Sequence, residues 1–207
     1  MAFKNMIFDL GGVLYDISPE RSVRAFSELL GGGQEEKVRR AAEETAAWKL
    51  HEQGLIGDGE FRDLVRESLG LSCSDAEVDA AWNALLLQPR EGVLDLLKRL
   101  KPDHRLVLLS NTNAIHFRQL QPGAQPILDC FERLFLSYEM GCRKPDAEIY
   151  EKVLAEMGWK AEDCLFIDDS FLNKIGAESV GISAICVDSP GQVGLFSYFE
   201  EYFSTDL

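Results

Sequence analysis

The sequence lacks the cysteine patterns that stabilise small secreted domains or bind zinc. Its 207 residues include five cysteines, an odd number, and no two of them form a Cys-x-x-Cys pair. A disulfide framework needs paired cysteines, and a zinc site needs closely spaced ligands. We therefore expect reduced thiols and a cytoplasmic protein.

Positive charge is also scarce. The chain has 21 Lys and Arg against 35 Asp and Glu, a formal net charge of −14, and the basic residues form no run. Such a charge repels nucleic-acid backbones and anionic membranes unless basic residues gather in one patch. We expect neither nucleic acid nor a membrane as a partner.

Long hydrophobic runs are missing as well. The apolar run at residues 6–8 is broken by Asp9, and no later stretch approaches the roughly 20 residues that span a bilayer. The hydrophobic share, 46%, is ordinary for a globular domain. The sequence therefore predicts a folded protein without an export signal, and a monomer is the default expectation.

Five short apolar segments are typical of buried parallel strands. They are rich in leucine, aromatic and β-branched residues and are bounded by polar or glycine positions: 5–8, 105–109, 133–136, 164–167 and 182–187. Segments with helical periodicity lie between them, at 91–100, 146–157 and 172–180. This alternation predicts an α/β fold with a doubly wound parallel sheet.

The first two predicted strands lie much farther apart than one crossover helix requires. The intervening residues 17–85 contain no convincing strand but four helical stretches, at 21–30, 35–53, 59–69 and 74–87. The last begins with Ser74 and Glu77 in the spacing of a capping box. We predict that residues 17–85 form a small helical-bundle cap on a core made of residues 1–16 and 86–207.

Polar residues follow four of the five predicted strands. In a doubly wound sheet, ligands bind beyond the carboxyl ends of the strands, where such residues meet. In chain order they are Asp9, Ser110, Asn111, Lys144, Asp168 and Asp169. Three neighbouring carboxylates need a cation, and hard oxygen ligands suit Mg²⁺. A metal, a lysine and a hydroxyl together can bind a phosphoryl group.

Four segments resemble, in order, the motifs of the haloacid dehalogenase-like hydrolase superfamily: residues 7–14 (IFDLGGVL), 109–113 (LSNTN), 143–145 (RKP) and 166–170 (FIDDS). The inserted helices resemble that superfamily's helical cap of the first type. The motifs are also similar to the subgroup that includes bacterial α-D-glucose 1-phosphate phosphatases. The resemblance implies a Rossmann-like core and a Mg²⁺-dependent phosphatase whose substrate is a small phosphorylated metabolite, a sugar phosphate in particular.

The resemblance also implies a role for each site residue. Asp9 would be the nucleophile that forms an aspartyl phosphate. Ser110 and the Asn111 amide would hold phosphoryl oxygens, and Lys144 would neutralise charge on the transferred group. Mg²⁺ would be held by the Asp9 side chain, the Gly11 backbone carbonyl and Asp169, with Asp168 assisting directly or through water.

Gly11 departs from the pattern, because most phosphatases of this superfamily have at this position a second Asp that acts as general acid. Glycine donates no side-chain proton, so a contribution of about 10²–10⁴-fold is missing or is supplied elsewhere. Asp16, at the hinge into the cap, and Glu52, within the cap, are candidate replacement acids. Alternatively, the enzyme uses no acid and acts on anomeric, acyl or aryl phosphates, whose leaving groups need little protonation.

Two other functions are compatible with these residues. In a metal-independent 2-haloacid dehalogenase, Asp9 would attack carbon, although the paired acids Asp168 and Asp169 argue against this. A non-catalytic phosphate-binding or regulatory protein on the same fold is favoured only by Gly11. Metal dependence and turnover distinguish these alternatives.

Overall fold

The computed structural model describes residues 3–188 and 191–205. Its centre is a five-stranded parallel sheet with the strand order β5-β4-β1-β6-β7. The strands are β1 (Asn5–Phe8), β4 (Arg105–Ser110), β5 (Arg133–Leu136), β6 (Cys164–Asp168) and β7 (Ser183–Cys186). After β1, the chain adds β4 and then β5 on one side of that strand, and afterwards adds β6 and then β7 on its other side. The prediction of a doubly wound parallel sheet is confirmed.

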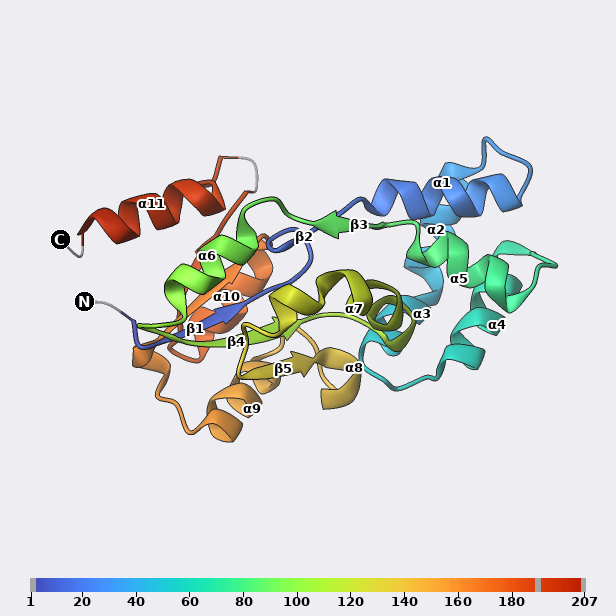
Figure 1. The fold of residues 1–207 in the computed structure, drawn as a ribbon. Coiled ribbons are helices and arrows are strands. Elements are labelled where there is room, and N and C mark those ends of the chain that lie inside the picture. Colours follow the sequence, from blue (N-terminus) through green and yellow to red (C-terminus); the bar gives the residue numbers. More distant parts are fainter. Residues whose placement is uncertain (1–2, 189–190, 206–207) are drawn as a thin grey trace.

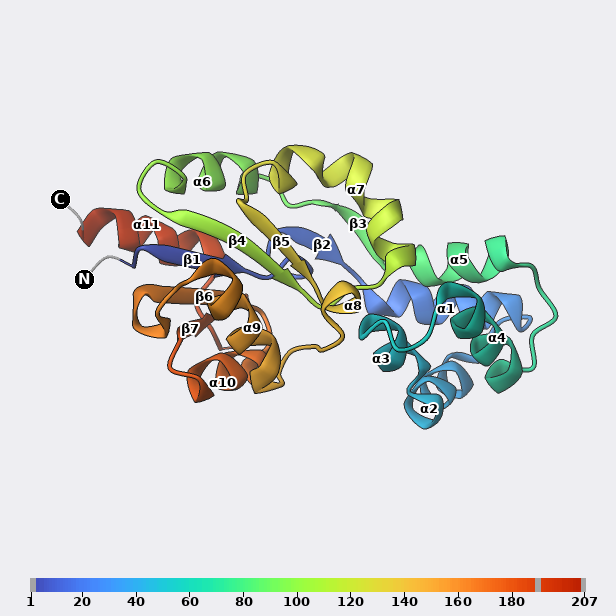
Figure 2. The same ribbon diagram turned by 90° about the horizontal axis from the view of Figure 1, so that it is seen from below.

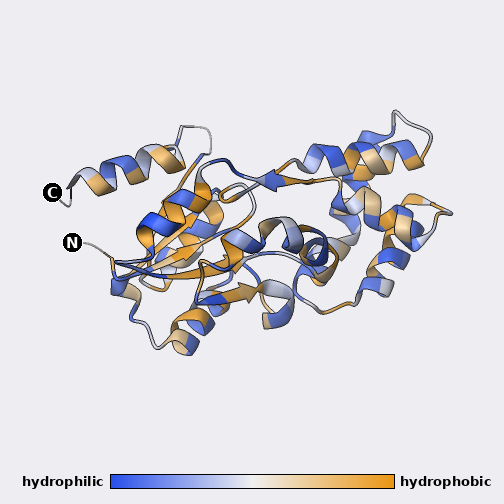
Figure 3. Ribbon diagram, viewed as in Figure 1, coloured by the Kyte–Doolittle hydropathy of each residue, from blue (hydrophilic) through white to orange (hydrophobic). Residues whose placement is uncertain are grey.

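Helices cover both faces of this sheet (Figures 1 and 2). One face carries α6 (Val93–Leu100), α7 (Ala114–Leu128) and α11 (Leu195–Thr205), and the other carries α9 (Ala147–Met157) and α10 (Phe171–Ser179). The sheet is hydrophobic along its strands (Figure 3). Alternating side chains supply both cores: Met6 and Phe8 join one cluster, and Ile7 joins the other. A short 3-10 turn, Ala161–Asp163, precedes β6.

Helix α7 is not predicted by the sequence, because Pro122 and Pro126 lie within it. Proline removes a backbone donor and normally ends or kinks a helix. Here Leu120, Ala124 and Ile127 pack into the core on that face of the sheet, and this burial outweighs the lost hydrogen bonds. Of the described helices, none combines the length and hydrophobicity needed to cross a membrane.

Five further helices form a second lobe, which we call the cap, beside the sheet (Figure 1). They are α1 (Pro19–Leu29), α2 (Glu35–Thr45), α3 (Ala47–Glu52), α4 (Asp58–Leu69) and α5 (Asp75–Asn83). The single helix expected at 35–53 is wrong, because Ala46 adopts a left-handed conformation (φ 49°) and separates α2 from α3. The capping box at Ser74 and Glu77 is present.

A two-stranded antiparallel sheet lies between the lobes. It pairs β2 (Tyr15–Ile17) with β3 (Leu86–Pro89). The helix expected at 74–87 therefore ends earlier, at Asn83. Strands this short carry too few residues for a period-two pattern, and pairing with a distant segment creates them. The division of the chain into residues 1–16 with 86–207 and residues 17–85 stays a prediction.

Candidate active site

Three acidic side chains meet at the carboxyl edge of the sheet. Asp9 follows β1, Asp168 ends β6, and Asp169 comes next along the chain. Because β1 and β6 are hydrogen-bonded neighbours, their ends bring these side chains together. One oxygen from each lies within 4.8 Å of the others, and Asp9 and Asp168 are buried. Such a group of hard oxygens can hold a divalent cation.

Lys144 reaches this cluster from the loop between α8 (Ser137–Met140) and α9. Its Nζ lies 2.7 Å from Asp9 Oδ1 and 2.7 Å from Asp168 Oδ2, and the side chain is only 1% exposed. Burial opposes its charge, but the two carboxylates outweigh burial and raise the pKa of Lys144. The lysine therefore remains an ammonium group inside the protein.

One ammonium group does not neutralise three carboxylates. Burial raises the pKa of Asp9 to about 7, Lys144 opposes this change, and Asp168 reinforces it. Burial, together with the charge of Asp168, also raises the pKa of Asp169. The cluster therefore retains an excess of negative charge that a bound cation would neutralise.

Asp168 is fixed by several donors. Besides Lys144, it accepts hydrogen bonds from the Ser170 backbone N–H (2.8 Å) and from Asn173 Nδ2 (3.0 and 3.1 Å to its two oxygens). Asn173 lies on α10, five residues after Asp168, and the sequence motifs do not identify it. These contacts make Asp168 suited to orienting Lys144. Asp9 and Asp169 are then the carboxylates better placed to hold a cation.

Gly12 permits the close approach of Asp169. Its φ is 79°, and a Cβ built on it would overlap with Asp169 Oδ2. Any side chain at this position would be strained and would displace the carboxylate. The second glycine of the first motif therefore has a steric role beside the acidic cluster.

The side chain of Asn111 holds the backbone of Lys144. Asn111 Nδ2 donates to the Lys144 carbonyl, and Asn111 Oδ1 accepts from the Lys144 N–H, both at 2.9 Å. Nearby, Ser137 Oγ bonds both the carbonyl and the N–H of Thr112 at 3.0 Å. The carboxamide of Asn111 is thus used within the protein to position Lys144. Ser110 is buried at the end of β4.

A cavity of about 200 Å³ lies over Gly11, between the sheet edge and the cap. Ser110 and Asn111 line it from the core, and Glu52 and Trp82 line it from the cap. A Cβ on Gly11 would lie 3.3 Å from Ile17 Cδ1. The side chain of Ile17 therefore covers position 11.

The two candidate acids occupy different environments. Glu52, at the end of α3, lines the cavity and accepts a hydrogen bond from Arg143 Nε (3.1 Å); its Oε2 also lies 3.0 Å from Arg143 Nη2 in an ion pair. Burial raises the pKa of Glu52, and Arg143 opposes this change. Asp16 lies on β2, is 39% exposed, and has its Oδ1 3.5 Å from Arg90 Nε. The structure brings Glu52 to the cavity and leaves Asp16 outside its lining.

His116 and Trp82 also line the cavity, although no spacing in the sequence distinguishes them. Their rings stack with centroids 4.6 Å apart, and His116 Nδ1 lies 2.9 Å from Asn83 Oδ1. Burial lowers the pKa of His116 to about 3, and the charge of His51 acts in the same direction. His116 is therefore neutral at physiological pH and is not a proton donor to a leaving group.

The cap contacts the core beside this cavity. Gly54, with φ of 66°, passes so close to α8 that a Cβ would overlap with the Tyr138 carbonyl oxygen. The views in Figures 1 and 2 place α3 next to α8. Together with the pair between Glu52 and Arg143, this backbone approach sets the position of the cap over the site.

Comparison with known proteins gives consistent matches. A model of haloacid dehalogenase-like hydrolases matches residues 3–181. A D-ribitol-5-phosphate phosphatase from Bacteroides thetaiotaomicron is 28% identical over 181 residues, 84% of this chain and 87% of that protein. A sesquiterpene phosphatase from Aspergillus oryzae is 30% identical over 181 residues, 87% of each chain.

A solved structure is also similar to this chain. The HAD family enzyme from Bacteroides thetaiotaomicron, in complex with magnesium and inorganic phosphate, superimposes with a TM-score of 0.82 at 36% identity. The alignment covers 91% of this chain and 96% of that enzyme. The family match spans the sheet strands β1, β4, β5 and β6 and the cap, and it includes every residue of the acidic cluster. The chain therefore belongs to the haloacid dehalogenase-like hydrolase family.

Proposed function

We propose that the protein hydrolyses the phosphate monoester of a small metabolite through an aspartyl-phosphate intermediate on Asp9. The chain is a phosphatase of its family, and Mg²⁺ is its cofactor. The observation that carries the proposal is the buried Lys144 ammonium, held between Asp9 and Asp168 beside a third carboxylate. A lysine and acidic cation ligands around one nucleophile fit a doubly charged phosphoryl group.

The residues present fit a magnesium ion. The cluster has more carboxylates than ammonium groups, and its donors are hard oxygens. We assign Asp9, Asp169 and the Gly11 carbonyl to the ion, with Asp168 acting through water or by orienting its neighbours. When bound, Mg²⁺ supplies positive charge to the phosphoryl oxygens.

The protein groups then account for the steps of the reaction. A carboxylate oxygen of Asp9 attacks phosphorus while the bond to the ester oxygen breaks, and the departing alcohol takes up a proton. Lys144, the Ser110 hydroxyl and the Asn111 backbone N–H stabilise the phosphoryl oxygens. Water then cleaves the aspartyl phosphate, which releases inorganic phosphate and restores Asp9.

We assign the missing proton donor to Glu52 in preference to Asp16. Glu52 lines the cavity over Gly11, and burial favours its protonated form. Asp16 is more exposed and pairs with Arg90 outside the lining. A carboxyl group on the cap would protonate the ester oxygen only while the cap covers the site.

The acidic cluster and Lys144 account for the phosphoryl group of the substrate, but they constrain its organic part less. A sugar phosphate is the expectation from sequence, and one relative is named after a polyol phosphate, ribitol 5-phosphate. Another relative is named after a sesquiterpene, which is apolar. These names define two substrate classes to compare.

The test is phosphate release from sugar, polyol, alkyl and aryl phosphates, with Mg²⁺ and with EDTA, for wild type and Asp9→Asn. We expect release that requires Mg²⁺ and is lost in the variant. Halide release from 2-halo acids without metal would instead identify a dehalogenase. Phosphate binding with no turnover of any ester would identify a binding protein.

A further inference from the structure

We propose that the group esterified to the phosphate is a hydrophobic chain of about ten carbon atoms that binds in a cavity inside the cap. This inference rests on the proposed phosphatase function, because a phosphate held at Asp9 and Lys144 fixes where the rest of the substrate lies. It deepens that function by choosing the apolar substrate class over the polyol class.

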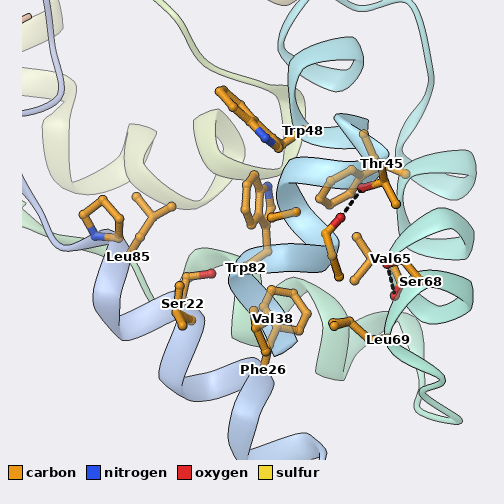
Figure 4. Close-up of a pocket in the computed structure, with 16 residues that line it drawn as sticks. Ser22, Phe26, Val38, Thr45, Trp48, Val65, Ser68, Leu69, Trp82 and Leu85 are labelled. Atoms are coloured by element: carbon orange, nitrogen blue, oxygen red, sulfur yellow. Dashed lines mark hydrogen bonds between the residues drawn. The ribbon is translucent and has the colours of Figure 1, made fainter. Parts of the chain in front are cut away.

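The cavity lies within the helical bundle and has a volume of about 370 Å³. Phe26, Val38, Val65, Leu69 and Trp82 surround it (Figure 4). Ligand pockets in proteins commonly measure about 300–1,000 Å³. If a methylene group occupies about as much volume as a water molecule, roughly 30 Å³, the cavity accommodates on the order of ten carbons.

The lining offers little to a sugar. Among the described residues, none that lines the cavity is charged. The hydroxyls of Thr45 and Ser68 donate within their own helices, to the carbonyls of Ala41 (2.9 Å) and Val65 (3.1 Å), as the dashed lines in Figure 4 show. A polyol placed here would lose its water without gaining equivalent hydrogen bonds, which is unfavourable. An alkyl or isoprenoid chain carries no such penalty.

The cavity lies beside two buried clusters of the cap, which Val65 and Trp82 connect. Phe26 and Val38 belong to one of these clusters, whereas Phe61 belongs to the other, and all three line the cavity. Protein domains usually have one contiguous core with few voids larger than a water molecule. The space is partly open to solvent, so a hydrophobic ligand that fills it would remove the apolar lining from water, which is favourable.

The cavity adjoins the active site. Pro19, Trp82 and Leu85 line both this cavity and the smaller one over Gly11. Ile17, beside Gly11, adds a further apolar side chain at the junction. Trp82 is shared by the two linings, so its ring lies where the cavities meet. A phosphate at Ser110 and an apolar chain in the cap therefore fit one continuous substrate.

The first experiment measures kcat/KM for n-alkyl phosphates from ethyl to dodecyl, kept below their micelle concentrations, and for ribitol 5-phosphate and glucose 1-phosphate. We expect a rise of about three- to fourfold per methylene, levelling near ten carbons. We also expect polyol and sugar phosphates to be at least 100-fold poorer substrates than decyl phosphate. A flat profile, or a preference for the polyol or sugar ester, overturns the inference.

Cavity-filling variants test whether the dependence of kcat/KM on chain length arises in this cavity. Ser22→Leu and Val38→Phe place extra carbon in the cavity from two different helices, and Ser72→Leu makes the first change at an exposed residue of the cap. We expect the ratio of kcat/KM for octyl over ethyl phosphate to fall at least tenfold in both filled variants and to stay unchanged in Ser72→Leu. If Val38→Phe fails to fold, Ser22→Leu alone decides. An unchanged ratio in a folded filled variant overturns the proposal.

A binding measurement without turnover separates the inference from the proposed function. Calorimetry with n-octylphosphonate and ethylphosphonate should show tighter binding of the longer chain and a more negative heat-capacity change. That difference should shrink in Ser22→Leu. Phosphate release that ignores chain length overturns only this inference, whereas no release from any ester overturns the proposed function and the inference with it.

Discussion

Asp9 combines the chemical role of a nucleophile with an unfavourable environment for a carboxylate. Replacing it with Asn removes the attacking oxygen, so we expect kcat to fall on the order of 10³-fold or more. Phosphate release under saturating Mg²⁺ measures this loss. Asp103→Asn makes the same change at an exposed residue; it is the matched control and should retain full activity.

The same substitution should stabilise the metal-free protein. Burial raises the pKa of Asp9 from 3.8 to about 7. The carboxyl group therefore contributes stability that is full below pH 3.8 and is lost as the pH rises through 7. In EDTA, Asp9→Asn should raise the free energy of unfolding more at pH 8 than at pH 4, by on the order of a few kcal/mol at pH 8. A variant less stable than wild type at pH 8 would contradict this interpretation of the site.

The role of Glu52 can be tested by varying the leaving group. Glu52→Gln cannot donate the proton, so we expect kcat/KM for alkyl phosphates to fall about 10²–10⁴-fold, with a small change for p-nitrophenyl phosphate. Asp16→Asn is the matched comparison and should leave both substrates unaffected. Equal losses on both ester classes would mean that Glu52 only positions Arg143. Loss in Asp16→Asn alone would transfer the role to that residue.

At the scale of elements, the contact between α3 and α8 depends on a glycine. Gly54→Ala would place a methyl group against the Tyr138 carbonyl oxygen and would strain a backbone with φ of 66°. We expect the cap to shift and kcat/KM to fall on the order of 10²-fold, the usual cost of a small misplacement. Gly59→Ala, in α4, meets no atom within 4 Å and should keep full activity. Thermal unfolding of both variants checks that the fold is intact.

At the scale of the whole molecule, Mg²⁺ should couple stability to pH. Burial and the neighbouring Asp168 raise the pKa values of Asp9 and Asp169, so protons compete with the cation as the pH falls. We expect the Mg²⁺ concentration for half-maximal activity to rise about tenfold between pH 7 and pH 6, at constant ionic strength. Mg²⁺ should also raise the unfolding midpoint of wild type, and this shift should be absent from Asp9→Asn. A Mg²⁺ requirement independent of pH would contradict the assignment.

The sequence by itself determines the sheet and the set of polar residues at its edge. Runs such as residues 5–8 and 164–167 are apolar throughout because both faces of a central parallel strand are buried. Asp9 and Asp168 stand at the ends of such runs, and strand ends are where α/β proteins bind ligands. Local patterns therefore suffice to predict the fold and most of the site, because strand propensity and strand-end position are properties of neighbouring residues.

Only the tertiary structure decides which distant residues share the site. Glu52 meets Arg143 across 91 positions, and no pattern near either residue signals the contact. The contact of the Asn111 carboxamide with the Lys144 backbone likewise joins two segments that are distant in sequence. The two prolines in α7 are tolerated because the helix packs on the sheet. The cavity in the cap is a space between helices, and its shape depends on how they pack. We therefore expect substrate choice to depend on long-range packing, and the phosphoryl chemistry to depend on short motifs.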